Sequence, residues 1–338
     1  MLQYLLLPFA FLYGIILRIR HLLYDLGILK SCSFKQPVIV VGNLSFGGTG
    51  KSPHTLFLAK LLSSYKPAIL SRGYGRSTNG FIYVRADSSA SEVGDEPLMF
   101  KNYLPHIEVA VCENRCDGVS RLLGDEKKSG LVILDDAFQH RALKPGLSVL
   151  LFDYSSLEEN FFLVPAGKRR DIFSRWKSAD VIIATKTPKD FEIQMLENKF
   201  PGKAVFSSRY IYKELSSASG LPMKFEELSS KKVLLLTGIA DASDLKKKLN
   251  EYCTTVVHLE YPDHHKFEEK ELRSIRENMV MFAPENYLFI TTAKDFMRLK
   301  SLLNEQELNS WLIAEIEVEI NKPKEFESLI RSYVERNQ

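Results

Sequence analysis

The feature that most constrains this chain is a glycine-rich loop, Ser45 to Ser52, set between two segments of different character. The segment before it, Pro37–Gly42, is a short apolar run typical of a buried strand, and Thr55–Leu62 after it has helical periodicity. A strand, a glycine-rich turn ending in Lys-Ser and a helix together predict a Walker A phosphate-binding loop. Its glycines let backbone N–H groups converge on phosphate oxygens, and the helix presents its positive end to them.

The loop predicts roles for single residues. Lys51 should reach the β- and γ-phosphates of a nucleotide, and the Ser52 hydroxyl should bind Mg²⁺. Ser45 replaces the first glycine of the pattern, and Pro53 is acceptable in a first helical turn. The alternative is a glycine-rich turn with a coincidental lysine. The predicted nucleotide contacts are Gly47, Gly48, Thr49, Gly50, Lys51 and Ser52.

A second element lies further along the chain, where the apolar run Leu131–Leu134 ends in Asp135 and Asp136. An apolar strand that ends in an acidic residue is the Walker B arrangement, whose carboxylate meets Mg²⁺ across from the phosphate loop. We predict that Asp135 lies on the metal side and that Asp136 assists it or contacts substrate. ATP and Mg²⁺ are the expected nucleotide and metal.

Short apolar runs alternate with amphipathic segments through the first two-thirds of the chain, as in a parallel sheet covered by helices. The fold class is therefore α/β, a P-loop NTPase core of the RecA-like kind with a mostly parallel sheet. Helices are expected at Thr55–Leu62, Glu96–Tyr103 and Arg115–Leu123. The expected strands are Pro37–Gly42, Ala68–Ser71, Glu108–Cys112, Leu131–Asp135, Leu147–Asp153 and Asp180–Thr185.

A polar stretch at 209–231 reads as an irregular connector, and a second α/β series follows it. Its expected elements are strands Lys232–Thr237, Thr255–Leu259, Tyr287–Thr292 and Trp311–Val318, and helices Ala242–Leu249, Glu268–Asn278 and one from Pro323. The predicted division is 1–30 as a membrane-associating helix, 31–208 as the P-loop domain, 209–231 as a linker and 232–338 as a smaller C-terminal α/β domain. A length of 338 residues suits about two domains.

The N-terminus carries no charged side chain from Leu5 to Leu17, and Arg18, Arg20 and His21 then follow together. The run is shorter than the ~20 residues of a spanning helix, and it lacks the leading charges and cleavage site of a signal peptide. We predict a helix that lies in the membrane interface with its arginines near lipid phosphates. The alternative is a buried core helix.

Net charge and cysteine content indicate which kinds of ligand the chain is able to bind. The net charge of +3 is too small to indicate nucleic acid, and positive charge occurs in short groups that suit a local anionic ligand. The four cysteines are Cys32, Cys112, Cys116 and Cys253, and no Cys/His pair completes a zinc pattern. We expect all four to be reduced thiols in a cytosolic environment.

Several further motifs follow one another along the chain: Val41 to Pro53, Ser71 to Arg76, Gly94 to Pro97, Asp135 to Arg141, Pro262 to His264, and Thr292 with Lys294-Asp295. In this order they resemble the motifs of the tetraacyldisaccharide 4'-kinases of lipid A biosynthesis. The resemblance extends from the apolar N-terminus to about residue 300. Where the family usually has Thr-Glu-Lys-Asp, this chain has Ala293 and lacks that carboxylate.

The resemblance implies transfer of the ATP γ-phosphate to the 4'-hydroxyl of a tetraacyldisaccharide 1-phosphate, giving the bisphosphorylated lipid A precursor. It implies a protein at the cytoplasmic face of the bacterial inner membrane, and with the apolar N-terminus we expect it to be peripheral or monotopic. The small net charge predicts no nucleic-acid partner, and no obligate protein partner is evident from the sequence. Asp95 is the expected proton acceptor with His264 as its partner, a pair that closure of the two domains would assemble. The expected headgroup contacts are Arg72, Tyr74, Arg76, Arg115, Gln139, His140, Arg169 and Arg170.

Other functions remain open from the sequence. A membrane-anchored GTPase switch would normally read guanine with an Asn-Lys-x-Asp segment, whereas the strand ending at Thr185 continues as Lys186-Thr187-Pro188. A nucleotide-dependent assembly protein would bind ATP but lose no chemistry when Asp95 is replaced. A kinase for another amphipathic sugar is the third alternative.

Overall fold

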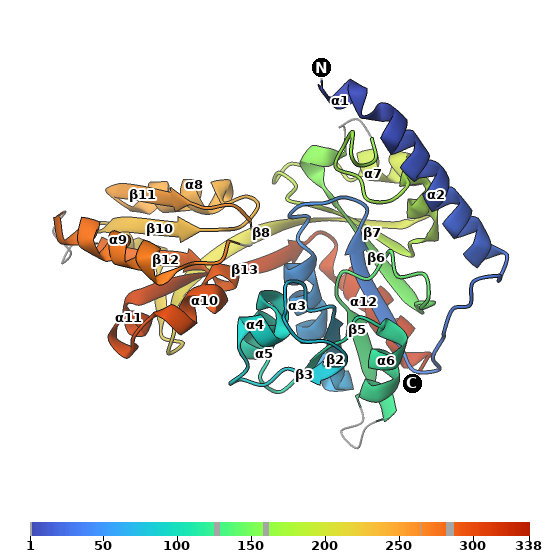
Figure 1. Ribbon diagram of the computed structural model, residues 1–338, viewed down its shortest axis with the longest axis horizontal. Helices are drawn as coiled ribbons and strands as arrows, with labels where there is room; N and C mark the ends of the chain where they lie inside the picture. Colours follow the sequence, from blue (N-terminus) through green and yellow to red (C-terminus); the bar gives the residue numbers. More distant parts are fainter. Residues whose placement is uncertain (1, 125–128, 158–161, 264, 282–286) are drawn as a thin grey trace.

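The computed structural model describes residues 2–124, 129–157, 162–263, 265–281 and 287–338. Its strands belong to one 13-stranded sheet with the order β11-β10-β12-β13-β8-β7-β6-β1-β5-β2-β4-β3, and β9 pairs with β8 off this path. Figure 1 shows the two halves of this sheet extending in opposite directions from β8. We refer to β1–β7 and their helices as the N-terminal half, and to β10–β13 and their helices as the C-terminal half.

The N-terminal half is a parallel sheet except at its edge, where β3 runs antiparallel to β4. Its strands are β1 (Val38–Asn43), β2 (Pro67–Ser71), β3 (Ile82–Tyr83), β4 (Glu108–Val111), β5 (Leu131–Leu134), β6 (Leu147–Asp153) and β7 (Val181–Thr185). Its helices are α3 (Lys51–Leu61), α4 (Ala90–Val93), α5 (Asp95–Tyr103), α6 (Arg115–Gly124) and α7 (Gln194–Lys199). The predicted strands and helices of this half are confirmed, with bounds shifted by a few residues.

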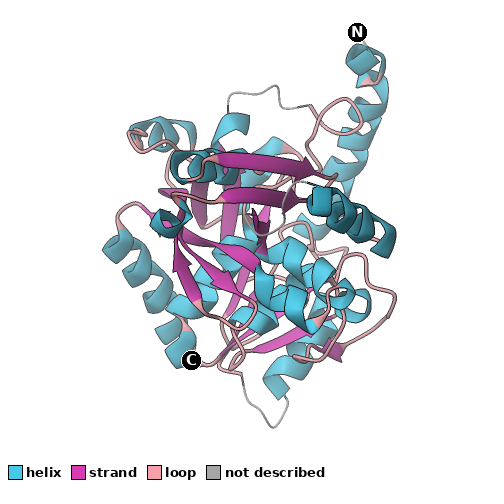
Figure 2. Cartoon of the chain, turned by 90° about the vertical axis from the view of Figure 1, so that its left-hand side faces the viewer, coloured by secondary structure: helices cyan, strands magenta, loops and turns pink. Residues whose placement is uncertain are grey.

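Strand β1 shows why these strands are apolar throughout. Ile39 and Val41 pack into one core with α3 and with the terminal helix α12 (Pro323–Glu335). Val38 and Val40 pack into a second core on the opposite face, with α6 and α7. Figure 2 shows helices on the outside of the strands. A strand covered on both faces needs apolar side chains at successive positions, so it reads as a continuous run.

The C-terminal half continues the sheet with β10 (Lys232–Thr237), β11 (Thr255–Glu260) and β12 (Tyr287–Thr292), all parallel, and with β13 (Trp311–Ile320). Its helices are α8 (Ser243–Tyr252), α9 (Glu269–Met281), α10 (Ala293–Leu299) and α11 (Glu305–Ser310). The predicted elements of this half are confirmed. The sequence did not indicate α10 and α11, which are only 7 and 6 residues long.

The expected irregular connector is wrong over its first part, because β8 (Ala204–Ser217) is a continuous 14-residue strand, with one shift of register against β13. It pairs parallel to β7 at its start and antiparallel to β13 from Ser208 onward, and β9 (Pro222–Lys224) then pairs back onto it. Its polar residues lie in cross-strand ion pairs with β13, such as Lys213 with Glu317. Charged and half-exposed side chains in this part of the strand made the segment look irregular. The division into domains stays a prediction.

Helices α1 (Leu2–Leu5) and α2 (Leu7–Asp25) lie along the outside of the N-terminal half (Figure 1). The inner face of α2 buries Ala10, Gly14, Leu17 and His21. Within the part of the chain that the structure describes, α2 is the one helix long and apolar enough to cross a membrane. The helix thus extends beyond the uncharged run and continues through Arg18, Arg20 and His21.

Candidate active site

The glycine-rich loop joins the end of β1 to the start of α3, as its sequence predicts. Gly47 and Gly50 have φ values of 108° and 82°, a region that L side chains rarely adopt. A Cβ atom on Gly50 would lie 1.6 Å from the Tyr210 hydroxyl oxygen of β8, so only glycine fits there. The Asn43 amide, at the end of β1, donates to Thr49 Oγ1 at 2.6 Å and holds the loop from inside. The loop is thus fixed by the fold around it.

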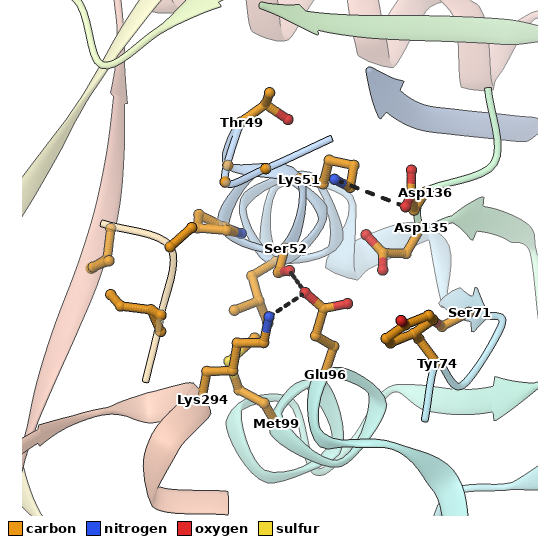
Figure 3. Close-up of a pocket in the computed structure, with 18 of the residues that line it drawn as sticks. Thr49, Lys51, Ser52, Ser71, Tyr74, Glu96, Met99, Asp135, Asp136 and Lys294 are labelled. Atoms are coloured by element: carbon orange, nitrogen blue, oxygen red, sulfur yellow. Dashed lines mark hydrogen bonds and ion pairs between the residues drawn. The ribbon is translucent and has the colours of Figure 1, made fainter. Parts of the chain in front are cut away.

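The loop opens into a cavity of about 1280 Å³ that also receives residues from the C-terminal half. Lys51 and Ser52 face it from α3, and Asp135 and Asp136 face it from the end of β5 (Figure 3). Lys51 Nζ lies 3.9 Å from Asp136 Oδ2, and Arg170 also pairs with that carboxylate. Every residue of the predicted Walker pair therefore lines one space.

The two aspartates differ in their electrostatics. Burial raises the pKa of Asp135 to about 7, and the Glu96 and Asp136 carboxylates add to the rise. Burial also acts to raise the pKa of Asp136, but Lys51 and Arg170 outweigh it and hold that pKa below its usual value. Among the described residues no ion pair reaches Asp135; its partner is the Thr55 hydroxyl, 3.0 Å away. Asp135 therefore lies where an additional cation would be stabilised.

Glu96 and Lys294 were not assigned a role from the sequence, although both fall inside the family-like motifs. Glu96 Oε1 accepts a hydrogen bond from Ser52 Oγ at 2.7 Å and lies 3.3 Å from Lys294 Nζ. Figure 3 shows this chain of contacts reaching from α3 through α5 to α10. Sequence reasoning missed it because only the folded sheet brings the three segments together.

Asp95 is the first residue of α5 and is 8% exposed, beside the cavity and not among its lining residues. Arg298 Nε of α10 lies 3.6 Å from Asp95 Oδ2, so this carboxylate lies at the contact between the two halves. The predicted partner His264 lies outside the described residues. The proposed Asp95–His264 pair therefore stays a prediction.

Six of the eight predicted headgroup residues line the cavity: Arg72, Tyr74, Arg115, Gln139, His140 and Arg170. The other two do not. Arg76 pairs with Glu113 and donates to the Gly80 carbonyl at 2.7 Å, which braces its own loop. Arg169 is 4% exposed and lies over the Phe173 ring. Burial lowers the pKa of His140 to about 4, helped by the positive charge of Arg115, so His140 is neutral near pH 7.

Helix α2 also reaches this site. Tyr13 and Arg20 line the cavity, and the Arg20 guanidinium donates to the Gln139 carbonyl at 3.1 Å. His21 Nε2 lies 2.7 Å from Asp171 Oδ1. The N-terminal helix is therefore attached to the loops that carry the predicted headgroup contacts.

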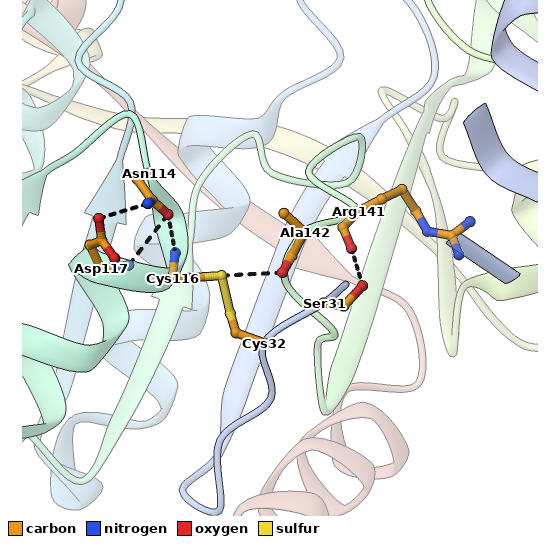
Figure 4. The surroundings of a disulfide bond; sticks show 7 residues. All are labelled: Ser31, Cys32, Asn114, Cys116, Asp117, Arg141 and Ala142. Atoms are coloured by element: carbon orange, nitrogen blue, oxygen red, sulfur yellow. Dashed lines mark hydrogen bonds between the residues drawn. A yellow bond between two sulfur atoms is a disulfide. The ribbon is translucent and has the colours of Figure 1, made fainter. Parts of the chain in front are cut away.

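The cysteines correct one expectation. Cys32, before β1, and Cys116, in the first turn of α6, form a disulfide with Cα atoms 6.2 Å apart (Figure 4). The prediction of reduced thiols is wrong for this pair, while Cys112 and Cys253 are free. Backbone hydrogen bonds join Cys32 to the 142–144 segment, and Cys116 Sγ lies 3.2 Å from the Ala142 carbonyl oxygen, so both cysteines lie against the same loop. Their separation of 84 residues gave no signal in the sequence.

A family model, curated relatives and a solved structure all relate this chain to the same group of kinases. A family model described as tetraacyldisaccharide-1-P 4'-kinase matches residues 2–335. A tetraacyldisaccharide 4'-kinase of Flavobacterium psychrophilum is 42% identical, over 98% of this chain and 96% of that protein. One of Bacteroides thetaiotaomicron is 38% identical, over 98% of this chain and 93% of that protein. A crystal structure of LpxK from Aquifex aeolicus in complex with ATP superposes with a TM-score of 0.80 at 31% identity, covering 99% of this chain and 100% of that one.

Proposed function

The chain belongs to the tetraacyldisaccharide-1-P 4'-kinase family, and from that premise we propose how its cavity carries out the reaction. The protein is an ATP-dependent kinase of lipid A biosynthesis that phosphorylates the 4'-hydroxyl of a tetraacyldisaccharide 1-phosphate and forms the bisphosphorylated precursor. The observation that carries the proposal is a single cavity lined by the glycine-rich loop with Lys51, by Asp135 and Asp136, and by α2.

The glycine-rich loop is a P-loop that holds the ATP phosphates. Its backbone amides and Lys51 neutralise charge on the β- and γ-phosphates, and α3 presents its positive end to them. Glycines at 47 and 50, with positive φ, support the close approach of this backbone to phosphate. The strand β7 leads into Lys186-Thr187-Pro188 without an Asp to pair with guanine, which favours adenine over guanine nucleotides.

Mg²⁺ would be held by Ser52 and Asp135, with Asp136 assisting. The electrostatics around Asp135 support this fit. Burial and two neighbouring carboxylates raise the pKa of Asp135, and a bound cation would stabilise its ionised form. Mg²⁺ commonly keeps several waters and is bound by one or two carboxylates together with substrate phosphates, which a serine hydroxyl and two aspartates suit. When bound, Mg²⁺ would neutralise charge on the transferred phosphoryl group.

The acceptor hydroxyl loses its proton to Asp95, with His264 as the partner that holds and stabilises the proton. The 4'-oxygen forms a bond to the γ-phosphorus, the bond from that phosphorus to the β–γ bridging oxygen breaks, and ADP leaves. Asp95 precedes Glu96, which lines the cavity, and it contacts Arg298 of the C-terminal half. Closure of the C-terminal half over the P-loop domain would bring these groups to the substrate.

The headgroup lies between the basic residues of the cavity and α2. Guanidinium groups of Arg72, Arg115 and Arg170 suit bidentate contacts to the 1-phosphate, and Tyr74, which is 69% exposed, offers a ring face to the sugar. Arg76 and Arg169 position the surrounding loops. Because Tyr13 and Arg20 line the same cavity, a lipid held at α2 has its headgroup next to the phosphates.

The protein lies on the cytoplasmic face of the inner membrane, with α2 in the lipid interface. Large apolar side chains of α2 face outward, including Phe11, Leu12, Ile16 and Ile19, each more than half exposed. The opposite side of the helix is bonded to the protein body at His21 and Arg20. A helix attached along one side and apolar on the other fits the surface of a bilayer better than its interior.

The test of the function is phosphate transfer from [γ-³²P]ATP to a purified tetraacyldisaccharide 1-phosphate, followed by chromatography of the lipid. We expect label at the 4'-position, a requirement for Mg²⁺, and much slower turnover with GTP. Lys51→Ala should abolish transfer while the protein stays folded. A wild-type protein that binds ATP but labels no lipid would favour the assembly-protein alternative, and preference for GTP would favour the switch.

A further inference from the structure

We propose that Lys294 is a catalytic residue that brings positive charge to the transferred phosphoryl group from the C-terminal half, opposite Lys51. This inference rests on the proposed kinase function and adds a residue to its site. Lys294 is the second residue of α10 and lines the same cavity as the P-loop. Figure 3 shows its side chain extending toward Ser52 from the side away from Lys51.

The contacts of Lys294 place its ammonium group beside the predicted metal and phosphate site. Its Nζ lies 3.3 Å from Glu96 Oε1, and that same oxygen accepts the Ser52 hydroxyl at 2.7 Å. A single carboxylate oxygen thus separates the ammonium group from the P-loop serine. Asp263 Oδ1 lies 4.0 Å from the same Nζ. The lysine side chain is 17% exposed, so its charge acts with little screening by water.

The helix that carries Lys294 is held in a fixed position. Thr292 caps it by accepting the Asp295 N–H at 3.2 Å. Arg298, one turn on, binds Asp295 at 2.8 Å and the backbone carbonyls of His265 and Gly238 at 3.0 Å each. The Asn102 amide of α5 also contacts Met297 Sδ at 3.4 Å, so α10 packs directly on the helix that carries Glu96. A preorganised charge of this kind needs no rearrangement during the reaction.

The carboxylates of the cavity and the phosphates of its substrates carry negative charge that a second lysine would help to neutralise. Glu96, Asp135 and Asp136 already crowd the end of β5, and Lys51 and Arg170 both face Asp136. ATP and the 1-phosphate would add further negative charge. A loose phosphoryl-transfer transition state spreads charge over three equatorial oxygens, which one cation on the P-loop side reaches from one direction only. Lys294 supplies a compact charge from the other direction, and its neighbour Ala293 adds no charge.

A purely structural role would make different predictions. If Lys294 only joined the two halves through Glu96, its loss would weaken folding or ATP binding and leave the chemical step intact. A cation on the transferred phosphoryl group instead stabilises the transition state more than the ground state, so its loss lowers kcat. Lys294→Gln separates the two roles because an amide can still donate to Glu96 but carries no charge.

The experiment compares Lys294→Met, Lys294→Gln and Lys294→Arg with a control, Lys247→Met, an exposed lysine of α8. We expect kcat with the lipid disaccharide to fall by roughly 100-fold in the Met and Gln variants, as for loss of one oxyanion donor, and less in the Arg variant. The KM for ATP should change by less than about threefold, since the lost contact is made in the transition state. Affinity for ADP with aluminium fluoride should fall with kcat, whereas affinity for a non-hydrolysable ATP analogue should not.

Wild-type turnover in the Gln variant overturns the proposal while the kinase function stands. So does a parallel loss of affinity for the ATP analogue and for the aluminium fluoride complex. If Lys294→Met does not fold by circular dichroism, the Gln variant alone decides. If wild-type protein and Lys247→Met transfer no phosphate, the proposed function itself has failed, and the assignment of Lys294 fails with it.

Discussion

At the scale of single residues, His54 has both ring nitrogens engaged inside the molecule. Its Nδ1 lies 2.7 Å from the Gly50 carbonyl oxygen, and its Nε2 lies 2.9 Å from Ser208 Oγ. A ring nitrogen can contact a carbonyl oxygen only as a donor, so Nδ1 carries the proton and Nε2 accepts from the serine hydroxyl. The side chain is 1% exposed. His54 therefore connects the P-loop to β8 in its neutral form.

Protonation of His54 should destabilise the fold. Burial lowers its pKa to about 4, from 6.5 in the unfolded chain. Between those values the unfolded state binds a proton that the folded state does not, so stability from this residue is complete above pH 6.5 and is lost as pH falls toward 4. The slope from one group is about 1.4 kcal/mol per pH unit. We would measure the free energy of unfolding by urea at several pH values from 7.5 to 4. It should fall less steeply with falling pH for His54→Asn than for wild type. The exposed His106→Asn should match wild type, and equal slopes for all three proteins would contradict the expectation.

A second residue-scale prediction concerns Asp95. Asp95→Asn keeps the size of the side chain but removes the proton acceptor, so phosphate transfer should fall by roughly 10²- to 10⁴-fold. Binding of an ATP analogue, measured by calorimetry, should stay within a few-fold of wild type, because Asp95 does not line the cavity. Undiminished transfer by Asp95→Asn would remove Asp95 from the mechanism and would point to another acceptor.

At the scale of elements, the regular strands and the phosphate loop were predictable, and the contacts between elements were not. Strands such as β1 and β5 are buried on both faces and read as continuous apolar runs. Strand β8 was missed in part because residues 209–214 are half-buried or exposed and include charged side chains, so they do not form a continuous apolar run. The site was predicted at Lys51 and Asp135, which lie in local motifs. Lys294 and Tyr13 were missed, since nothing in their own segments shows that the sheet brings them to one cavity.

In the glycine-rich loop, replacement of Gly50 should destabilise the protein. A methyl group there would meet the Tyr210 hydroxyl at 1.6 Å and would also force a φ of 82° on an L residue. Gly50→Ala should lower the free energy of unfolding by roughly 1–3 kcal/mol and weaken ATP binding more strongly, because the loop must shift. Thermal unfolding with and without ATP measures both effects. Gly124→Ala, at an exposed position with open space, is the control. ATP stabilisation equal to wild type in Gly50→Ala would show that the loop can adapt.

At the scale of the whole molecule, both halves of the sheet and helix α2 contribute residues to one cavity. Strand β8 pairs with β7 in one half of the sheet and with β13 in the other, so it connects the two halves directly. The cavity receives Lys51 from one half, Lys294 from the other and Arg20 from the N-terminal helix. The phosphate-binding loop and the N-terminal helix thus meet at one cavity. The disulfide between Cys32 and Cys116 adds a covalent tie between the segment after α2 and α6.

This arrangement predicts that membrane binding and ATP binding can be separated. Leu12, Ile16 and Ile19 are 57%, 55% and 53% exposed and contribute to the outward face of α2. Replacing all three with Gln keeps the helix but removes apolar surface worth about 3 kcal/mol or more in lipid, which is roughly a 100-fold weaker partition. Sedimentation with vesicles of phosphatidylethanolamine and phosphatidylglycerol should show that loss, and ATP-analogue affinity should not change.

The control is Leu221→Gln, which removes a still more exposed leucine, 70% exposed, from the turn between β8 and β9. Because that turn is not part of α2, the change should leave vesicle binding intact. Transfer to substrate in vesicles should then fall in the triple variant and recover when the same lipid is presented in detergent, since the cavity itself is unaltered. Persistent vesicle binding by the triple variant would mean that another surface holds the membrane. Failure to recover in detergent would mean that α2 shapes the cavity and does more than deliver the lipid to it.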